Sequence, residues 1–249
     1  MNKLSLLLTA LLSLLVASCG HRNDIIIEGT LENASGKTIY ISEQTPESHI
    51  RLDSIVLDRK GHFKFRHAMP YRTFINVSLS DNDFIVLLPD FGEKVKFIGD
   101  CRSLHTTYRI QGGGESLLLW QLQNQTNKSD SVIHELIATS NKNKALLSDG
   151  DMSELEYACE KRITDSLFWN EYSSFQQYVV HFIEDNLGSL STLIALYKEF
   201  NGRIPIINPN DSFEFYEGVL IGLQEALPDN PHTLHFQNEV ERDRFHYAR

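Results

Sequence analysis

Three cysteines are the residues of this 249-residue chain with the clearest capacity for chemistry. Cys19, Cys101 and Cys159 are far apart, and no two of them form the CxxC pair used in dithiol redox chemistry or zinc binding. Cys101 and Cys159 could form a disulfide in an oxidising compartment. The favoured alternative is two separate thiols, with Cys159 as a small apolar residue of the core, because the sequence shows no proximity between them.

Cys19 follows a segment with the features of a secretory leader. Lys3 precedes an apolar run over residues 4–17, which is shorter than the roughly 18 residues of a membrane-spanning helix. The run ends in Val16-Ala17-Ser18-Cys19, which resembles the lipobox of bacterial lipoproteins. In that family the cysteine sulfur receives a diacylglycerol, and cleavage makes the cysteine the new N-terminus. The resemblance implies a signal peptide over 1–18, a lipidated Cys19 and a tether over 19–23, the alternative being an ordinary secretory peptide.

The predicted lipid on Cys19 makes a membrane the first expected partner of the chain. Gly20 stands next to it, where some lipoproteins carry the acidic residue that retains them at the inner membrane. The resemblance therefore implies an outer-membrane location, and leaves open whether the protein faces the periplasm or the exterior.

Two further groups of residues could support catalysis or metal binding. His232, His235 and Glu239 have a spacing compatible with one helical face and with zinc. No additional ligand is evident, so a solvated or capping histidine pair is favoured over a metal site, and we expect no cofactor. Asp53-Ser54 lacks a GxSxG elbow and an assignable histidine, so we expect it to organise backbone hydrogen bonds.

Aromatic residues of the first half are candidates for a binding surface. Tyr71, Phe74 and Phe91 could form a platform for a sugar or a peptide, although such residues more often fill a core or a domain interface.

A possible modification site lies in the second half of the chain. Asp130-Ser131-Val132 resembles an Asp-Ser/Thr-aliphatic O-glycosylation signal of some Gram-negative anaerobes, with Ser131 as the acceptor. Two other stretches match the same short pattern, so chance occurrence is the alternative.

Composition limits the class of protein. The chain is 41% hydrophobic and 22% charged, which supports packed cores in one or two domains and argues against a disordered chain. Its formal net charge of -10 disfavours nucleic acid as the main partner.

The first half has the alternating pattern of β-strands. Over residues 24–111, short runs with period two are separated by turn residues, which predicts an antiparallel β-sandwich or barrel-like domain of about eight strands. The clearest hairpin joins 55–57 to 62–66 through Asp58-Arg59-Lys60-Gly61, where Gly61 can take a positive φ. Phe63 and Phe65 are expected to point inward.

The second half has helical spacing. Gly112-Gly113-Gly114 lacks the lysine and the spacing of a phosphate-binding loop, and is interpreted as a flexible junction before an all-helical domain over 115–249. Ser153 and Glu156 predict a capping box that opens a long helix. Its expected apolar face consists of Leu155, Cys159, Ile163, Phe168, Tyr172, Phe175, Val179 and Phe182. A shorter helix is expected from Leu190 to Phe200.

Several short patterns occur in an order that resembles a known family. They are Ile27-x-Gly29-x-Leu31, Ile39-Tyr40-Ile41, Leu52-Asp53-Ser54, Gly61-x-Phe63-x-Phe65, the segment 87–93, Gly99-Asp100, Phe182-Ile183-x-x-Asn186, the segment 189–196, and Leu227-Pro228-x-Asn230-Pro231-His232. This order is similar to the β-rich N-terminal domain of unknown function, with the helical region after it, in TlpA-like thiol-disulfide oxidoreductase lipoproteins of Gram-negative bacteria. The resemblance covers nearly all of the chain after the leader.

The chain departs from that family at the residues that carry its activity. The family enzymes have a Trp-Cys-x-x-Cys site in a C-terminal thioredoxin domain, whereas Trp120 and Trp169 are not followed by cysteine. The reductase activity is therefore not carried over by the resemblance.

Three functions remain. The first is a lipid-anchored, non-catalytic binding or scaffolding module of the cell envelope, because no catalytic group of residues is recognised. The alternative is an accessory or truncated member of a thiol-disulfide oxidoreductase system, with a thioredoxin-like protein as partner. The third is glycan binding by the β-rich half at the cell surface.

Overall fold

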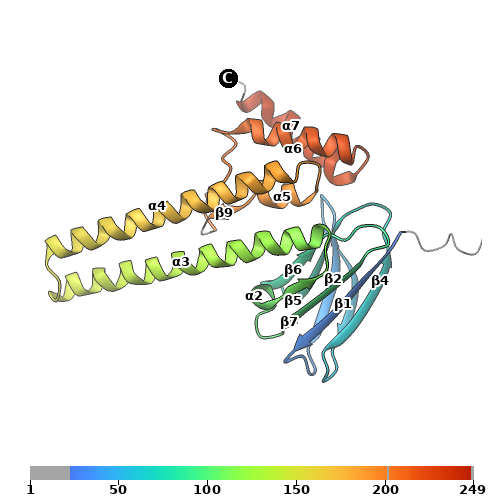
Figure 1. Ribbon diagram of the computed structural model, residues 1–249, viewed down its shortest axis with the longest axis horizontal. Coiled ribbons are helices and arrows are strands. Elements are labelled where there is room, and N and C mark those ends of the chain that lie inside the picture. The colour runs from blue at the N-terminus through green and yellow to red at the C-terminus, as the bar shows by residue number, and fades with distance from the viewer. Residues whose placement is uncertain (1–22, 201, 248–249) are drawn as a thin grey trace, which may run out of the picture. The chain divides into compact units, whose positions relative to one another are not determined.

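The computed structural model of the protein describes residues 23–200 and 202–247, with side chains as far as Arg244. Cys19 and the predicted leader lie outside the described residues. The chain divides into two compact units, Met1–Ser116 and Leu117–Arg249. Strands are concentrated in the first unit and helices in the second, which confirms the predicted α+β fold class with segregated domains (Figure 1).

The described residues of the first unit form eight strands and one short helix before α3 begins. They are β1 (Asp24–Glu32), β2 (Thr38–Gln44), β3 (His49–Val56), β4 (His62–Ala68), β5 (Phe74–Ser80), β6 (Asp83–Leu87), β7 (Lys94–Asp100), α2 (Leu104–Thr107) and β8 (Arg109–Gln111). One sheet has the strand order β4-β1-β7-β8 and the other the order β3-β2-β5-β6. The strands thus form two separate four-stranded sheets and no closed barrel. Neighbouring strands are antiparallel, except for the parallel pair β1 and β7.

The core of this unit is formed by alternate residues of its strands. Ile25 and Ile27 on β1 and Ile39 and Ile41 on β2 are fully buried, and the residues between them are partly exposed. The two phenylalanines of β4 are also buried, as predicted, while the polar side chains adjoining them are exposed. Burial of each large apolar side chain contributes about 1.5–3 kcal/mol relative to exposure, so these alternate positions fix which face of each strand points inward.

The predicted hairpin between residues 55–57 and 62–66 is wrong. β3 pairs with β2 and β4 pairs with β1, so residues 57–61 carry the chain from one sheet to the other. The turn itself is as expected, because Gly61 has a φ of 65° and its N–H donates to Asp58. Around the turn, Leu57 donates to the carbonyl of Lys37 and Leu31 donates to that of Gly61. These bonds tie the two ends of the turn to different strands.

The second unit consists of helices and one two-residue strand pair. The elements are α3 (Glu115–Asp149), α4 (Glu154–Asp185), α5 (Ser191–Leu196), β9 (Glu199–Phe200), β10 (Ile204–Pro205), α6 (Phe213–Ala226) and α7 (Pro231–Tyr247). The first two residues of α3 belong to the first unit. Within the described residues, no helix has both the length and the apolar character needed to cross a membrane.

The helix α4 begins at the predicted capping box. The hydroxyl of Ser153 accepts from the backbone N–H of Glu156, and the carboxylate of Glu156 accepts from the backbone N–H of Ser153 at 2.9 Å. Asn186 caps the other end of α4.

The expected apolar face of α4 is only partly buried. Phe175, Val179 and Phe182 are in the core, whereas Leu155 and Ile163 are exposed. The connection from α3 to α4 is short, so the start of α4 runs back along the end of α3 (Figure 1). Residues 138–145 of α3 are mostly polar and offer the first half of α4 few apolar groups, although Leu146 and Leu147 follow them in the last turn of α3.

The helix expected from Leu190 to Phe200 is shorter than predicted. α5 ends at Leu196, and Phe200 lies in β9. The Phe200 ring is buried against three aromatic rings of α4, those of Phe168, Tyr172 and Phe175, at centroid distances of 5.4, 5.2 and 6.1 Å. Phe200 therefore packs against the aromatic side chains of α4 from a position beyond the end of α5.

Candidate functional site

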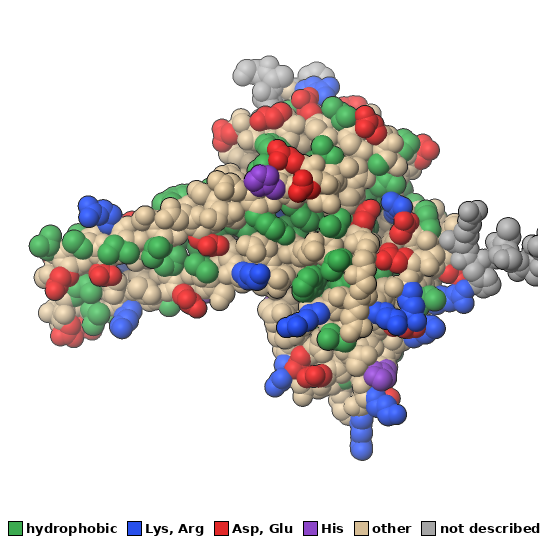
Figure 2. Space-filling view, viewed as in Figure 1, with side chains coloured by type: hydrophobic (Ala, Val, Ile, Leu, Met, Phe, Trp, Pro, Cys, Tyr) green, Lys and Arg blue, Asp and Glu red, His purple; other side chains and the backbone are tan. Residues whose placement is uncertain are grey.

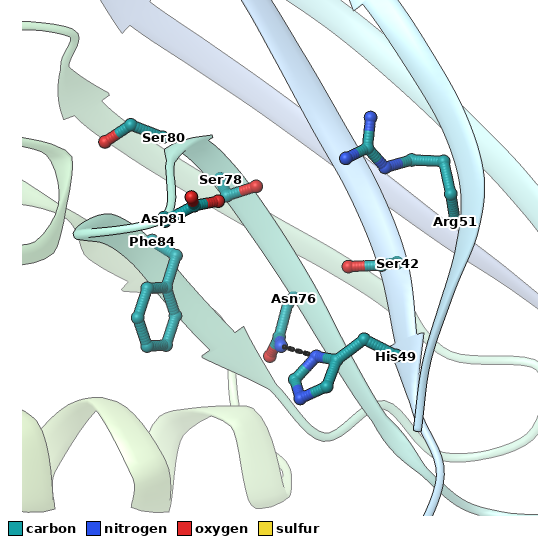
Figure 3. A pocket seen from close by; sticks show the side chains of 8 residues that line it. All are labelled: Ser42, His49, Arg51, Asn76, Ser78, Ser80, Asp81 and Phe84. Atoms are coloured by element: carbon teal, nitrogen blue, oxygen red, sulfur yellow. Dashed lines mark hydrogen bonds between the residues drawn. The ribbon is translucent and has the colours of Figure 1, made fainter.

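A groove of about 260 Å³ on one sheet of the first unit is the best candidate for a ligand site. It is lined by Ser42, His49, Arg51, Asn76, Ser78, Ser80, Asp81 and Phe84. These residues come from β2, β3, β5, β6 and the turn between β5 and β6. In Figure 3, Arg51 lies on one side of the groove and Phe84 on the other.

The floor of the groove consists of polar side chains on the two central strands. Ser42 of β2 is directly opposite Asn76 of β5. Their sequence neighbours Ile41, Ile75 and Val77 are fully buried in the core. Because side chains alternate along a strand, burial of these apolar neighbours turns Ser42 and Asn76 to the other face of the sheet.

A β-bulge determines which side chain of β3 reaches the groove. Ile41 pairs with Asp53, but the next residue, Ser42, pairs with Arg51, and Leu52 is skipped. In an uninterrupted ladder, Leu52 would stand opposite Ser42. The bulge thus places a guanidinium beside the groove floor in place of an aliphatic side chain, which is one of the recognised uses of such irregularities.

Arg51 is held in place by an aromatic ring. Its guanidinium carbon lies 4.2 Å from the centroid of the Tyr40 ring, a cation–π contact that orients the group. Stacking on the ring face leaves the N–H groups at the guanidinium edge available as donors toward the groove.

A hydrogen bond crosses the groove floor between His49 and Asn76. The amide nitrogen of Asn76 lies 3.3 Å from Nδ1 of His49, and the two side chains come from strands separated by β2. With the amide nitrogen as donor, Nδ1 is the acceptor. The Asn76 side chain is 6% exposed, and its carbonyl oxygen is buried without a hydrogen bond from any described residue.

The wall opposite Arg51 combines a carboxylate and an aromatic ring. Phe84 stands opposite Ser78 in the β5–β6 ladder and is 42% exposed. Asp81 comes from the turn between these two strands and is exposed. The groove therefore offers one positive group, one negative group, hydroxyl and amide groups, and one apolar surface.

The unit that holds the groove is close to electrical neutrality. Residues 23–116 contain 13 acidic and 11 basic residues, whereas residues 117–249 contain 20 acidic and 10 basic residues. On the face drawn in Figure 2, Lys and Arg side chains lie mostly over the sheets, and acidic side chains are frequent over α6 and α7. The acidity of the chain therefore comes from the helical unit, and the groove has no strong field of either sign around it.

The three predicted platform aromatics do not form one exposed surface. Phe74 is 2% exposed and cannot stack on a ligand at the surface. Tyr71 is half-buried, and burial, together with the charge of Glu43 and a hydrogen bond to it, raises the pKa of its phenol. Phe91 is 40% exposed. The ion pair between Arg72 and Asp90 joins the loops of Tyr71 and Phe91, and neither aromatic residue lines the groove.

Among the described residues, Cys101 and Cys159 are free thiols. Cys101 is buried, and burial raises the pKa of its thiol. The expectation that Cys159 lies in the core is wrong, because it is exposed on α4. Ser131 is exposed in the middle of α3. Asp53 accepts a hydrogen bond from the backbone N–H of Ser54 at 2.7 Å, so this pair organises backbone as predicted.

The histidines of α7 have different surroundings. His232 is 6% exposed, and its backbone N–H donates to the side chain of Asn230. Burial and the neighbouring His235 lower the pKa of His232 to about 4. His235 is 3.6 Å from Glu239, which also accepts from the hydroxyl of Tyr197. Within the described part of the chain, no cluster of three or more His, Cys, Asp or Glu side chains could hold a metal ion.

Comparison with known protein families and with curated proteins finds no match for this sequence. The groove is therefore assessed on its own geometry. Sequence reasoning missed it, although the outward positions of β2, β3 and β5 do carry a signal. Ser42, Asn76 and Ser78 are polar residues that alternate with the buried apolar residues Ile41, Ile75 and Val77, and His49 and Arg51 are polar residues of the paired strand β3.

Proposed function

We propose that the protein is a lipid-anchored binding module of a bacterial cell envelope. A diacylglyceryl group on Cys19 holds it to the membrane, and the groove on the β3-β2-β5-β6 sheet receives its ligand. The leader sequence supports the anchor, and the groove supports the binding role.

One observation carries the binding role. The groove gathers side chains from four strands and a turn, a β-bulge places Arg51 beside its floor, and a hydrogen bond across β2 joins His49 to Asn76. Concave sites with a few convergent polar groups are where small ligands bind. A buried amide oxygen without a partner, at Asn76, adds an unsatisfied polar group of the kind that is concentrated at functional sites.

The anchor is tested by detergent phase partitioning of the full chain expressed in a Gram-negative host. We expect the wild-type protein in the detergent phase, labelled by radioactive palmitate, and the Cys19→Ser variant unlabelled in the aqueous phase. Cys159→Ser is the matched control, because it removes an exposed thiol outside the lipobox. Equal partitioning of wild type and Cys19→Ser would refute the anchor.

The binding role is tested without assuming a class of ligand. Size-fractionated envelope fragments, containing glycans, peptides and lipid headgroups, are added to the purified full-length protein, and its melting temperature is recorded. We expect at least one fraction to raise the melting temperature of wild type and of Arg59→Ala, but not of Arg51→Ala. Arg59 is an exposed residue of the β3–β4 turn outside the groove. If every fraction affects wild type and Arg51→Ala equally, the groove is not the binding site.

A further inference from the structure

From the chemistry of the groove we infer that its ligand is a saccharide, bound through one or two sugar rings. This inference rests on the proposed binding role of the groove. It uses a different set of residues from the Tyr71, Phe74 and Phe91 platform expected from the sequence.

The hydrogen-bonding groups of the groove match hydroxyl groups. Ser42, Ser78 and Ser80 each offer a hydroxyl that both donates and accepts, Arg51 only donates, and Asp81 only accepts. A sugar ring presents adjacent hydroxyls that also donate and accept, so each of these side chains finds a partner on it. The lining can therefore hydrogen-bond to a ring with several hydroxyls better than to a ligand that offers only donors or only acceptors.

The same lining disfavours an anion as the main recognition element. A phosphate or carboxylate offers acceptors only, and it would place negative charge in a small groove that also contains the Asp81 carboxylate. Arg51 is the one Lys or Arg among the residues that line the groove, and the surrounding unit is nearly neutral. Sites built for anions use several donors or a helix N-terminus without an opposing carboxylate.

Phe84 supplies the apolar surface that a sugar needs. One face of a pyranose ring carries mainly C–H groups, which are weakly positive and apolar. The face of an aromatic ring is also apolar, and its quadrupole makes that face weakly negative. The C–H face of the sugar and the face of the ring therefore attract each other and exclude water. Phe84 is 42% exposed beside the hydroxyl of Ser78, so stacking and hydrogen bonding can act on the same ring.

The size of the groove sets the length of saccharide that it covers. Its volume of about 260 Å³ is below the range of roughly 300–1,000 Å³ for sites that enclose drug-sized ligands. One or two rings of a longer glycan fit this space better than an extended chain. A peptide would instead add a strand along a sheet edge, through backbone hydrogen bonds, whereas the groove offers side chains from a sheet face.

The inference is tested by saturation-transfer NMR and calorimetry on the purified full-length protein in detergent. The probes are neutral hexose, N-acetylhexosamine and hexuronic acid mono- and disaccharides, with short peptides of mixed sequence as a second panel. We expect at least one saccharide to receive magnetisation from aromatic protons at its ring C–H positions. Phe84→Ala should weaken its binding at least tenfold.

Phe91→Ala is the matched control, because Phe91 has nearly the same exposure but lies outside the groove. It should change saccharide affinity less than twofold. Circular dichroism of both variants confirms the fold, which an exposed side chain should not disturb. If a peptide binds, Arg51→Ala abolishes that binding and no saccharide binds, then the inference of a saccharide ligand is wrong, while the proposal of a binding module stands. Binding of no probe, with no melting shift from any envelope fraction, would overturn both.

Discussion

The Asn76 amide of β5 and the His49 ring of β3 are hydrogen-bonded across the intervening strand β2, with 3.3 Å between nitrogen atoms. Neighbouring strands are about 4.8 Å apart, so β3 and β5 are separated by about twice that distance. The His49 and Asn76 side chains together span this separation. The bond joins the two sides of the groove floor, so it contributes both to sheet stability and to the shape of the candidate site.

Replacement of either partner should therefore lower stability. We expect His49→Ala to reduce the free energy of unfolding by about 1–2 kcal/mol, because it leaves the buried Asn76 amide without its partner. Urea denaturation of His49→Ala, Asn76→Ala and the double variant gives the coupling energy, expected at about 0.5–1.5 kcal/mol. His62→Ala, an exposed histidine on β4, should be close to neutral. If the losses of stability in the two single variants simply add up in the double variant, the hydrogen bond between His49 and Asn76 does not contribute to stability.

Gly61 is expected to be the least replaceable of the turn glycines in the first unit. Its φ is 65°, and an added Cβ would lie 1.8 Å from the carbonyl oxygen of Leu31. Gly61→Ala should cost about 3 kcal/mol or more, because a left-handed alanine is strained and the backbone of β1 must also move.

Gly36→Ala is the control for the Gly61 substitution. Gly36 has a similar φ of 75°, but nothing lies within 4 Å of an added Cβ. It should cost only about 1–2 kcal/mol, the strain of the left-handed conformation alone. Thermal denaturation of both variants measures the difference, and equal melting temperatures would show that the contact with Leu31 is unimportant.

The two described cysteines should differ strongly in reactivity. Cys159 is exposed on α4, whereas Cys101 is buried and the pKa of its thiol is raised, so less thiolate is present at neutral pH. A maleimide should modify Cys159 within minutes and Cys101 only in urea, as measured by peptide mapping with mass spectrometry. Rapid modification of Cys101 in the folded protein would contradict its burial.

His232 should make the helical unit less stable in acid. Its pKa falls to about 4 on folding, from an ordinary value near 6.5, because burial and His235 disfavour the charged ring. The unfolded chain therefore binds this proton more readily, so stability is full above pH 6.5 and is lost as the pH falls toward 4. The loss attributable to His232 is about 2–4 kcal/mol.

Urea denaturation at several pH values checks this sign and size. His232→Gln should remove that part of the pH dependence, and His134→Gln, an exposed histidine on α3, should leave it in place. A slope unchanged by His232→Gln would mean that other groups cause the acid sensitivity.

The capping box of α4 should stabilise the first turn of that helix. Ser153→Ala removes an acceptor for the N–H of Glu156 and should cost about 1 kcal/mol. Hydrogen exchange should become faster in residues 154–158 and remain unchanged near Phe175. Ser166→Ala, an exposed serine inside α4, is the control and should be neutral or slightly stabilising. No change in exchange would show that the cap is dispensable.

Local sequence determined much of the architecture. The alternation of residues such as Phe63 and Phe65 decided which face of β4 is buried, because a strand side chain has only two faces to choose from. Ser153 and Glu156 determined the start of α4 through bonds within four residues. The change from period two to helical spacing after Gly114 separated strands from helices. These signals are readable because their causes are local.

Tertiary structure decided what depends on distant partners. The turn at Gly61 has the same local chemistry in a hairpin and in a crossover, and only the pairing of β3 with β2 and of β4 with β1 distinguishes them. Leu155 and Ile163 continue the apolar pattern of α4, yet both are exposed, because burial depends on what another segment packs against them and not on their own spacing. The groove also depends on long-range pairing, because a bulge selects Arg51 over Leu52 and strand order brings His49 to Asn76. The sequence alone thus determined the faces and ends of elements, while contacts between remote segments decided which of those faces form a site.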